Sequence, residues 1–492
     1  MAAEGRNQAV DARHSPVGQW LRSTRRFVDE GMKTVVNRLS ARRVLRLALL
    51  TVASSAVANA QTYTDLYDFD YVHGAAPEYP ALLAQGRDGN LYGTTSLGGS
   101  QGSGVGFKIT PTGTLTRLYS FCTQTNCADG LAPWSGMTLG TKGNFYGSTI
   151  ASGENGGGGT IFEGIPGVGL STLYTFTSGT DVFAPPIEGI DANFYGTTAA
   201  RDGSAVGTAY RMTLSGNFIS LGSIPGASYA PLLQATDGDF YGTTFNGGAY
   251  DGGTVFKMTP AGAVKTLWDF DDGHVYAPLI EGGDGNFYGT TQTGGAYKEG
   301  VVFKLTPEGV TVLHNFGDPN YPSDGGEPSA GLIQATDGNF YGVTDGGGTL
   351  GYGIIFQISP TGAYSILHNF DFSSGAIPAS TPMQHTNGTI YGLASQGGTF
   401  RNCGVVYSFD LGLPPFVALA ARAGKVGQTG GILGQGFSGA TSVLFNGTSA
   451  PFTVVSDTYL TATVPPGATT GFITVATPSG TLTSNQKFQV RP

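Results

Sequence analysis

Short stretches of alternating hydrophobic and polar positions recur along most of the chain, separated by glycine-rich turns. They are organised around the phrase Asn-Phe-Tyr-Gly-Thr-Thr or a close relative of it. Its tyrosine falls at Tyr92, Tyr146, Tyr195, Tyr241, Tyr288, Tyr341 and Tyr391. The spacing is about fifty residues, a period that indicates propeller blades or a similar array.

Each repeat reads as four short strands, here called A to D in chain order. In the fourth repeat we expect them at 230–234, 240–244, 254–258 and 264–270. Asp237-Gly238 predicts a tight turn between A and B, and Pro260-Ala-Gly262 predicts another between C and D. The alternation is imperfect, which is typical of sheets covered on both faces.

The strand order is offset at the two ends of the repeat array. A D-type strand, residues 64–69, precedes the first B strand, whereas the last repeat stops after its C strand, residues 405–409. We therefore expect residues 63–69 to pair with 405–409, because this pairing would close a ring and leave few exposed sheet edges. The predicted fold is all-β: a seven-bladed β-propeller closed by an N-terminal strand, followed by a small immunoglobulin-like β-sandwich.

The repeat resembles a known tandem-repeat family. The phrases are Asp-Gly-Asn-Phe-Tyr-Gly-Thr-Thr at 284–291, Gly-Gly-Thr-Val-Phe-Lys at 252–257 and Thr-Pro-x-Gly-x-x-Thr-x-Leu-x-x-Phe at 110–121. They resemble the GloVer repeat of secreted bacterial proteins over residues 62–410. The resemblance implies export and a propeller-like fold but no known activity. Kelch repeats have a similar length, but the chain has only three tryptophans, so the regular kelch tryptophan is absent.

A second domain follows Pro414-Pro415, which we interpret as a linker. Residues 414–492 contain Gly434-Gln-Gly-Phe437 and the strand-like stretches 440–447 and 471–475. This order is similar to an IPT/TIG immunoglobulin-like domain. The resemblance implies a spacer or a binding module.

The beginning of the chain has the features of an export signal. Arginines at 42, 43 and 46 precede an apolar run that ends at Ala58-Asn59-Ala60, the small-x-small pattern of a signal-peptidase site. We expect residues 1–60 to be the signal region, with cleavage before Gln61 and Met32 as an alternative start. The propeller would then span 61–413, without a transmembrane segment, in a secreted or cell-surface bacterial protein.

Composition and charge exclude several classes of protein and of binding partner. Glycine supplies 80 of 492 residues and charged residues only 12%, which excludes a coiled coil and a basic nucleic-acid binder. Without residues 1–60 the chain keeps 15 basic and 30 acidic residues, a net charge of −15. Such a chain is repelled by nucleic acid and anionic lipid. We expect a monomer whose partners are extracellular glycans or cell-envelope proteins.

The residues offer little catalytic chemistry. Histidines are scarce, and neither Gly-x-Ser-x-Gly nor His-Glu-x-x-His occurs. The Asp-Gly-Asn turns are followed at once by a strand, so they lack the six to eight oxygens that calcium needs. We therefore assign no catalytic residue, metal or cofactor. Cys122 and Cys127 are close enough for a local disulfide in an oxidising compartment, which leaves Cys403 over.

The D–A and B–C connections form the most promising surface, because they vary in length and carry aromatic residues. Aromatic rings beside carboxylates suit sugar binding, although rings can equally pack beneath their own loops and His274 can lie in a plain solvated loop. The candidate ligand residues are Trp134, Tyr229, Asp272, His274, Tyr276 and Tyr321 from D–A connections, and Tyr250, Tyr297 and Tyr352 from B–C connections. The leading hypothesis is a non-catalytic glycan-binding or adhesion protein. The alternatives are an extracellular carbohydrate-active lyase or hydrolase on the same face, and a structural surface spacer.

Overall fold

A computed structural model of the protein describes residues 61–80, 82–152, 157–177, 179–200, 207–400 and 402–491. The predicted signal region, residues 1–60, lies outside the described residues. The described chain is all-β apart from a 3₁₀ turn, η2, at Thr125–Cys127. None of the helices in this part of the chain has the length and hydropathy that a membrane crossing requires.

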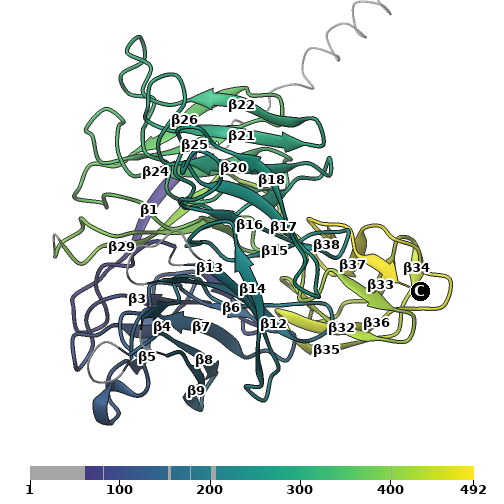
Figure 1. The fold of residues 1–492 in the computed structure, drawn as a ribbon. Helices are drawn as coiled ribbons and strands as arrows, with labels where there is room; N and C mark the ends of the chain where they lie inside the picture. Colours follow the sequence, from purple (N-terminus) through teal and green to yellow (C-terminus); the bar gives the residue numbers. More distant parts are fainter. Residues whose placement is uncertain are drawn as a thin grey trace, which may run out of the picture. The chain divides into compact units, whose positions relative to one another are not determined.

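The described repeat region contains seven antiparallel sheets, each with the strand order A-B-C-D (Figure 1). The A strands have two residues each and the B strands five to seven. The A strands are β2 (Ala84–Gln85), β6 (Thr138–Leu139), β11 (Ile187–Glu188), β15 (Leu233–Gln234), β19 (Ile280–Glu281), β23 (Ile333–Gln334) and β27 (Met383–Gln384). The B strands are β3 (Leu91–Thr95), β7 (Phe145–Thr149), β12 (Phe194–Ala200), β16 (Phe240–Thr244), β20 (Phe287–Thr291), β24 (Phe340–Thr344) and β28 (Ile390–Ala394).

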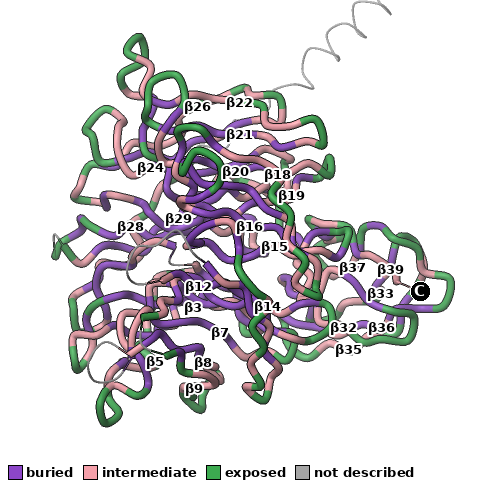
Figure 2. The backbone as a smooth tube through the Cα atoms, in the orientation of Figure 1, coloured by how far each residue is buried: buried purple, intermediate pink, exposed green. Residues whose placement is uncertain are grey.

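The C strands are buried like the B strands, whereas the D strands are part-exposed at the outer edges (Figure 2). The C strands are β4 (Val105–Ile109), β8 (Thr160–Ile165), β13 (Gly207–Met212), β17 (Thr254–Met258), β21 (Val301–Thr306), β25 (Ile354–Ile358) and β29 (Val405–Asp410). The D strands are β1 (Thr62–Asp68), β5 (Leu115–Ser120), β9 (Gly169–Thr175), β14 (Phe218–Ile224), β18 (Val264–Asp269), β22 (Gly309–Asn315) and β26 (Tyr364–Asn369). A further short strand, β10 (Thr180–Asp181), pairs with β12.

The recurring Tyr-Gly pair of the B strands is explained by packing. A Cβ atom on Gly242 would lie 2.5 Å from the ring of Phe256, and one on Gly289 would lie 2.7 Å from the ring of Phe303. An aromatic ring of the C strand, a phenylalanine in five sheets and Tyr210 or Tyr407 in the other two, thus occupies the space above the glycine of the paired B strand. Any side chain at that position would displace a buried ring.

Strand β1 pairs with β29, as the strand offset predicts. The register is antiparallel, with Tyr63 opposite Phe409 and Asp68 opposite Val405. The sheet at the end of the repeat array therefore has the order β1-β29-β28-β27, so its D strand comes from the start of the described residues. Phe69, which follows β1, is fully buried in a cluster that also contains Phe107 and Val406.

Neighbouring sheets are joined by a repeated hydrogen bond, which we call the junction hydrogen bond. A side-chain oxygen on the second residue of an A strand accepts from a backbone N–H in the A–B turn of the preceding sheet, at 2.6 to 3.1 Å. The pairs are Glu188 with Thr141, Gln234 with Ile190, Glu281 with Thr236, Gln334 with Gly283, Gln384 with Thr336 and Gln85 with Thr386. The last of these joins the sheet at the end of the array to the first one.

Leu139 occupies the equivalent position in the second sheet, and its side chain has no oxygen atom that could accept this hydrogen bond. There, Nη2 of Arg87 donates to the carbonyl oxygen of Thr141 at 2.5 Å. An arginine from the preceding turn thus joins the two sheets instead.

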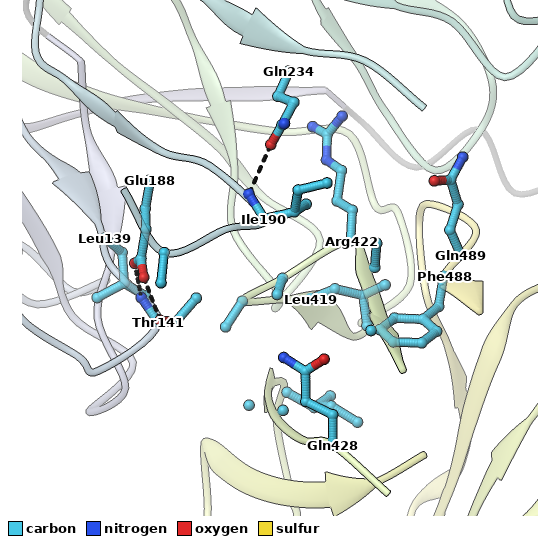
Figure 3. Close-up of a pocket in the computed structure, with 18 of the residues that line it drawn as sticks. Leu139, Thr141, Glu188, Ile190, Gln234, Leu419, Arg422, Gln428, Phe488 and Gln489 are labelled. Carbon is cyan, nitrogen blue, oxygen red and sulfur yellow. Dashed lines mark hydrogen bonds between the residues drawn. The ribbon is translucent and has the colours of Figure 1, made fainter. Parts of the chain in front are cut away.

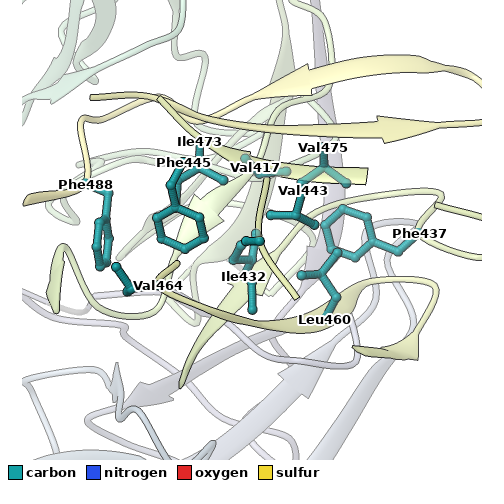
Figure 4. Close-up of a cluster of buried hydrophobic side chains, with 12 residues drawn as sticks. Val417, Ile432, Phe437, Val443, Phe445, Leu460, Val464, Ile473, Val475 and Phe488 are labelled. Atoms are coloured by element: carbon teal, nitrogen blue, oxygen red, sulfur yellow. The ribbon is translucent and has the colours of Figure 1, made fainter. Parts of the chain in front are cut away.

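The C-terminal region consists of two four-stranded antiparallel sheets and a two-stranded parallel one. Their buried side chains form one cluster, in which Ile432 and Leu460 of one sheet lie with Val443 and Val475 of the other (Figure 4). The strands are β30 (Ala418–Leu419), β32 (Thr429–Leu433), β36 (Tyr459–Thr463) and β35 (Phe452–Ser456); β34 (Thr448–Ser449), β33 (Ser442–Phe445), β37 (Ile473–Thr477) and β38 (Gly480–Thr483); and β31 (Ala423–Lys425) with β39 (Gln489–Arg491).

The cysteines are arranged as the sequence predicts. Cys122 and Cys127 are joined by a disulfide within the D–A connection after β5, and Cys403 is free. The disulfide encloses η2, so it constrains a short surface loop.

Deleting residues 61–70 should cause aggregation or a large fall in melting temperature. The deletion removes β1, exposes the edge of β29 and takes Leu66, Tyr67 and Phe69 out of the core. Each large apolar side chain contributes about 1.5–3 kcal/mol, against a net stability of roughly 5–15 kcal/mol. Calorimetry on the deleted and full mature chains provides the measurement.

Single substitutions test the contribution of this segment residue by residue. Phe69→Ala should cost about 3–5 kcal/mol because the ring is fully buried, whereas Tyr71→Ala, at a side chain that is 49% exposed, should be nearly neutral. A melting temperature of the deleted chain within a degree or two of the mature chain would contradict a structural role for β1.

Candidate functional site

Aromatic side chains from successive D–A connections meet one another. Four consecutive sheets place an aromatic residue four positions before the A strand: Trp134, Phe183, Tyr229 and Tyr276. Their ring centroids follow one another at 5.7, 4.5 and 5.4 Å, and the ring of Tyr79 adds a fifth member 5.6 Å from Tyr276. We call these five half-buried residues the aromatic arc.

Two further rings extend the aromatic arc. The ring of Phe245, the residue after β16, lies 5.3 Å from Tyr229 and 4.6 Å from Tyr276. The His274 imidazole stacks on Phe245 at 4.4 Å, and its Nδ1 lies 3.1 Å from the Thr293 hydroxyl. These contacts place His274 beside the arc rather than in solvent alone.

The backbone that carries these connections is strained in a repeated way. Ala76, Ala132, Glu327 and Ile377 each precede a proline and have φ between 47° and 55°, a region that non-glycine residues enter at a cost of about 1 kcal/mol. Each N–H donates to a carbonyl oxygen in the B–C connection of the preceding sheet, at 2.8 to 3.1 Å. Each carbonyl accepts from the residue after the B strand of its own sheet. The strained residues therefore fix the connections between neighbouring sheets.

A carboxyl group adjoins the aromatic arc. Asp345 follows β24, and its Oδ2 accepts a hydrogen bond from the Ser329 hydroxyl at 2.6 Å. The same hydroxyl accepts from the side-chain amide of Gln292 at 3.0 Å. Ser329 occupies the position that the aromatic residues hold in other sheets, four residues before its A strand. Oδ1 of Asp345 is buried without a hydrogen-bond partner.

The environment makes Asp345 an unusual acid. Burial raises the pKa of its carboxyl group to about 7, and the neighbouring Glu327 and Glu78 carboxylates add to this increase. Burial also raises the pKa of Glu78. Burial first, then Tyr229 and Asp345, raise the pKa of Tyr276 to about 12. The Asp345 carboxyl group is therefore near enough to Tyr276 to affect the pKa of its hydroxyl group.

The structure brings together four of the nine ligand residues that the sequence suggests. Trp134, Tyr229, His274 and Tyr276 belong to the aromatic arc or contact it. Within the described ranges, the other five make no ring contact with the arc. Tyr250 and Tyr321 are 66% and 68% exposed, Tyr297 is exposed, Tyr352 packs on Phe372, and Asp272 pairs with Lys298.

Sequence reasoning did not assign Tyr79, Phe183, Phe245, Ser329 and Asp345 to the site. Aligning the repeats by strand gives the missing signal. The residues immediately after the B strands of the first, second, fourth, fifth, sixth and seventh sheets are Ser96, Ile150, Phe245, Gln292, Asp345 and Ser395. Asp345 is the single charged residue among these six.

Comparison with family models agrees with the repeat seen in the sequence. The Gloeobacter/Verrucomicrobia repeat model matches residues 52–191, 123–278 and 185–409, and the IPT/TIG domain model matches residues 423–490. The chain therefore belongs to the Gloeobacter/Verrucomicrobia repeat family, and its C-terminal region is an IPT/TIG domain. Both predicted resemblances are confirmed.

Solved structures give only remote likenesses. Virginiamycin B lyase from Staphylococcus aureus is 13% identical, with a TM-score of 0.47, covering 71% of this chain and 98% of that one. A luciferin-regenerating enzyme is 12% identical, with a TM-score of 0.39, covering 72% and 97%. A search of curated proteins found no significant match. At such TM-scores these likenesses do not indicate an activity.

The stability of the protein should fall as the pH rises from about 4 to about 7, in part through Asp345. An unfolded aspartate has lost its proton over this range, whereas the folded chain keeps the proton on Asp345 until about pH 7. Asp345→Asn is neutral throughout, so its unfolding free energy should fall less between pH 5 and pH 8 than that of the wild type. Urea unfolding at the two pH values measures the difference.

The exposed Asp272→Asn is the matched control and should keep the wild-type slope. Burial also raises the pKa of Asp65 in β1 to about 7, so Asp345→Asn should reduce the dependence rather than remove it. Identical slopes in Asp345→Asn and the wild type would show that Asp345 carries no proton at neutral pH.

Proposed function

We propose that the repeat region is a closed seven-bladed β-propeller and that the C-terminal region is an immunoglobulin-like β-sandwich. The pairing of β1 with β29 and the junction hydrogen bond between Gln85 and Thr386 support closure, because both connect the start of the array to its end. The shared core of Ile432, Leu460, Val443 and Val475 supports two packed sheets in the C-terminal region.

On this scaffold we propose a secreted or cell-surface, non-catalytic binding protein that recognises a glycan. The repeat and the IPT/TIG domain both fit a surface or binding protein. The observation that carries the proposal is the aromatic arc: five neighbouring rings from five connections, each half-buried. Apolar faces of sugar rings stack on aromatic side chains, and a row of rings offers several such contacts.

The polar edge of the arc suits the same ligand class. Asp345 retains one buried oxygen without a partner, and sugar hydroxyls both donate and accept hydrogen bonds. A carboxyl group with a pKa near 7 can donate a hydrogen bond when it is protonated and accept one when it is ionised. A neutral, hydroxyl-rich ligand also avoids the repulsion that the net charge of the chain imposes on polyanions.

Replacing arc residues should weaken glycan binding. A glycan array with the mature protein identifies ligands, and calorimetric titration compares Tyr229→Ala and Tyr276→Ala with the wild type. Loss of one stacking ring should lower the affinity about tenfold, the equivalent of about 1.4 kcal/mol. Tyr250→Ala and Tyr321→Ala, which remove exposed tyrosines outside the arc, should bind like the wild type.

Equal affinities in the arc variants and the wild type would contradict binding at the arc. If no array glycan binds and none is cleaved, the propeller is better described as a structural spacer.

A carbohydrate-active enzyme is the second candidate, and Asp345 is the observation that favours it. A carboxyl group with a raised pKa can serve as a general acid, and Glu78 and Glu327 provide further carboxyl groups nearby. Incubating the bound glycans with the protein and measuring new reducing ends or unsaturated sugars separates the two functions. Turnover that Asp345→Asn abolishes without loss of binding identifies an enzyme, and binding without turnover identifies a binding protein.

Export is the remaining part of the proposal. The Ala58-Asn59-Ala60 pattern supports cleavage before Gln61, and the Cys122–Cys127 disulfide suits an oxidising compartment. N-terminal sequencing of the protein recovered outside the cytoplasm should begin at Gln61. An intact leader on the mature protein would overturn the secretion proposal.

A further inference from the structure

A cavity of about 770 Å³ lies between the A–B turns of the repeat region and the C-terminal domain (Figure 3). The A–B turns and the D–A connections are at opposite ends of the A strands, so this cavity is separate from the aromatic arc. Its repeat-side wall includes Thr141, Ile190 and Gln234, and its other wall includes Leu419 and Phe488. Its volume is in the range of small-molecule sites, about 300–1,000 Å³.

The two walls are held to each other by specific contacts. The Thr458 hydroxyl donates to the carbonyl oxygen of Arg87 at 2.7 Å, and the guanidinium of Arg87 lies 4.4 Å from the ring centroid of Tyr459. On another turn, Nε2 of Gln489 donates to the carbonyl oxygen of Thr236 at 2.6 Å. The turns and strands that line the cavity are therefore joined by direct contacts between its two walls.

Arg422 supplies the cavity with a positively charged group that no protein side chain pairs with in the described residues. Its side chain extends from the C-terminal domain into the cavity toward Gln234 (Figure 3). Arg422 is half-buried, and its partial removal from water lowers the pKa of the guanidinium. Among the described residues no hydrogen bond or ion pair satisfies this guanidinium.

The neighbouring carboxylates are already engaged. Glu188 accepts from the backbone N–H and the hydroxyl of Thr141, at 2.6 and 2.7 Å. Glu281 accepts from the same two groups of Thr236, so it influences Arg422 only through its charge. A half-buried arginine without a protein partner has lost part of its hydration, and no ion pair compensates for that loss.

Positive charge is concentrated here in a chain that is acidic elsewhere. Arg87, Arg422 and Arg491 all line the cavity, whereas Glu188 is the acidic residue of the described lining. The side-chain amides of Gln234, Gln428 and Gln489 also line the cavity, and those of Gln234 and Gln489 each already donate one hydrogen bond to a backbone carbonyl oxygen. Both walls also carry apolar side chains, namely Leu139, Ile187, Ile190, Leu419 and Phe488.

We propose that this cavity binds a small organic anion whose carboxylate or phosphate group pairs with the guanidinium of Arg422. The planar guanidinium donates two parallel hydrogen bonds to such a group, which would satisfy the partnerless cation. The apolar side chains of both walls would cover the body of the ligand. Because both domains line the cavity, bound ligand would also strengthen the contact between them.

Thermal shift and calorimetric titration on the full mature chain test this proposal. The probes are inorganic phosphate, glucuronate and glucose 6-phosphate at up to 10 mM, with neutral glucose as control and ionic strength held constant with KCl. At least one anion should raise the melting temperature by about 2 °C or more, and glucose should not. A larger response to glucuronate identifies a carboxylate ligand, and a larger response to the phosphates a phosphorylated one.

Arg422→Met should lower the affinity for that anion at least about thirtyfold, as expected when one partner of a buried charge pair is removed. Arg422→Lys keeps the positive charge but loses the bidentate guanidinium, so it should bind the anion with intermediate affinity. If the Arg422→Met chain does not fold, Arg422→Lys takes its place in the test. Arg117→Met, at an exposed arginine on β5, should bind like the wild type.

The proposal is overturned if none of the three anions gives a shift, if glucose gives the same shift, or if Arg422→Met and Arg422→Lys bind the anion as the wild type does. These outcomes leave the proposal for the aromatic arc untouched, since the two sites share no residue.

Discussion

The pairing of β1 with β29 is the interaction on which the rest of the repeat region depends. It joins strands more than 300 residues apart and gives the sheet at the end of the array its fourth strand. Phe69 follows β1 into a cluster that contains side chains of both the first and the last sheet. This strand covers the edge of β29 and places its apolar side chains between the first and the last sheet.

The junction hydrogen bonds set how each sheet is aligned with the sheet before it. Each one ties an A strand to the A–B turn of the preceding sheet, so equivalent residues of successive repeats occupy equivalent places. At the other end of the A strands, the left-handed residues before proline tie each D–A connection to the sheet before it. A residue placed at one position of the repeat therefore meets its counterparts from the neighbouring repeats, and this is how single aromatic residues about fifty positions apart form one continuous arc.

The two ends of the A strands differ in chemistry as a result. Varied residues at the D–A end bring rings and the Asp345 carboxyl together, which suits a neutral ligand rich in hydroxyl groups. At the A–B end the turns are uniform, and the distinctive residues come from the C-terminal domain, above all Arg422. That end suits an anion, because a half-buried cation without a protein partner is stabilised most by an opposite charge.

The sequence by itself determined the repeat period, the four strand types and their offset, because hairpin turns and two-residue alternation are local properties. The Tyr-Gly pair, the Cys122–Cys127 loop and the pairing of residues 63–69 with 405–409 could be predicted from such patterns. Only the tertiary structure decided which connection residues meet. Trp134, Tyr229 and Tyr276 lie just before an A strand, where neighbouring sheets approach, whereas Tyr250 and Tyr321 lie farther out in their loops. Asp345 and Arg422 gave no local signal, since the burial of a side chain and the partners it finds depend on residues remote in sequence.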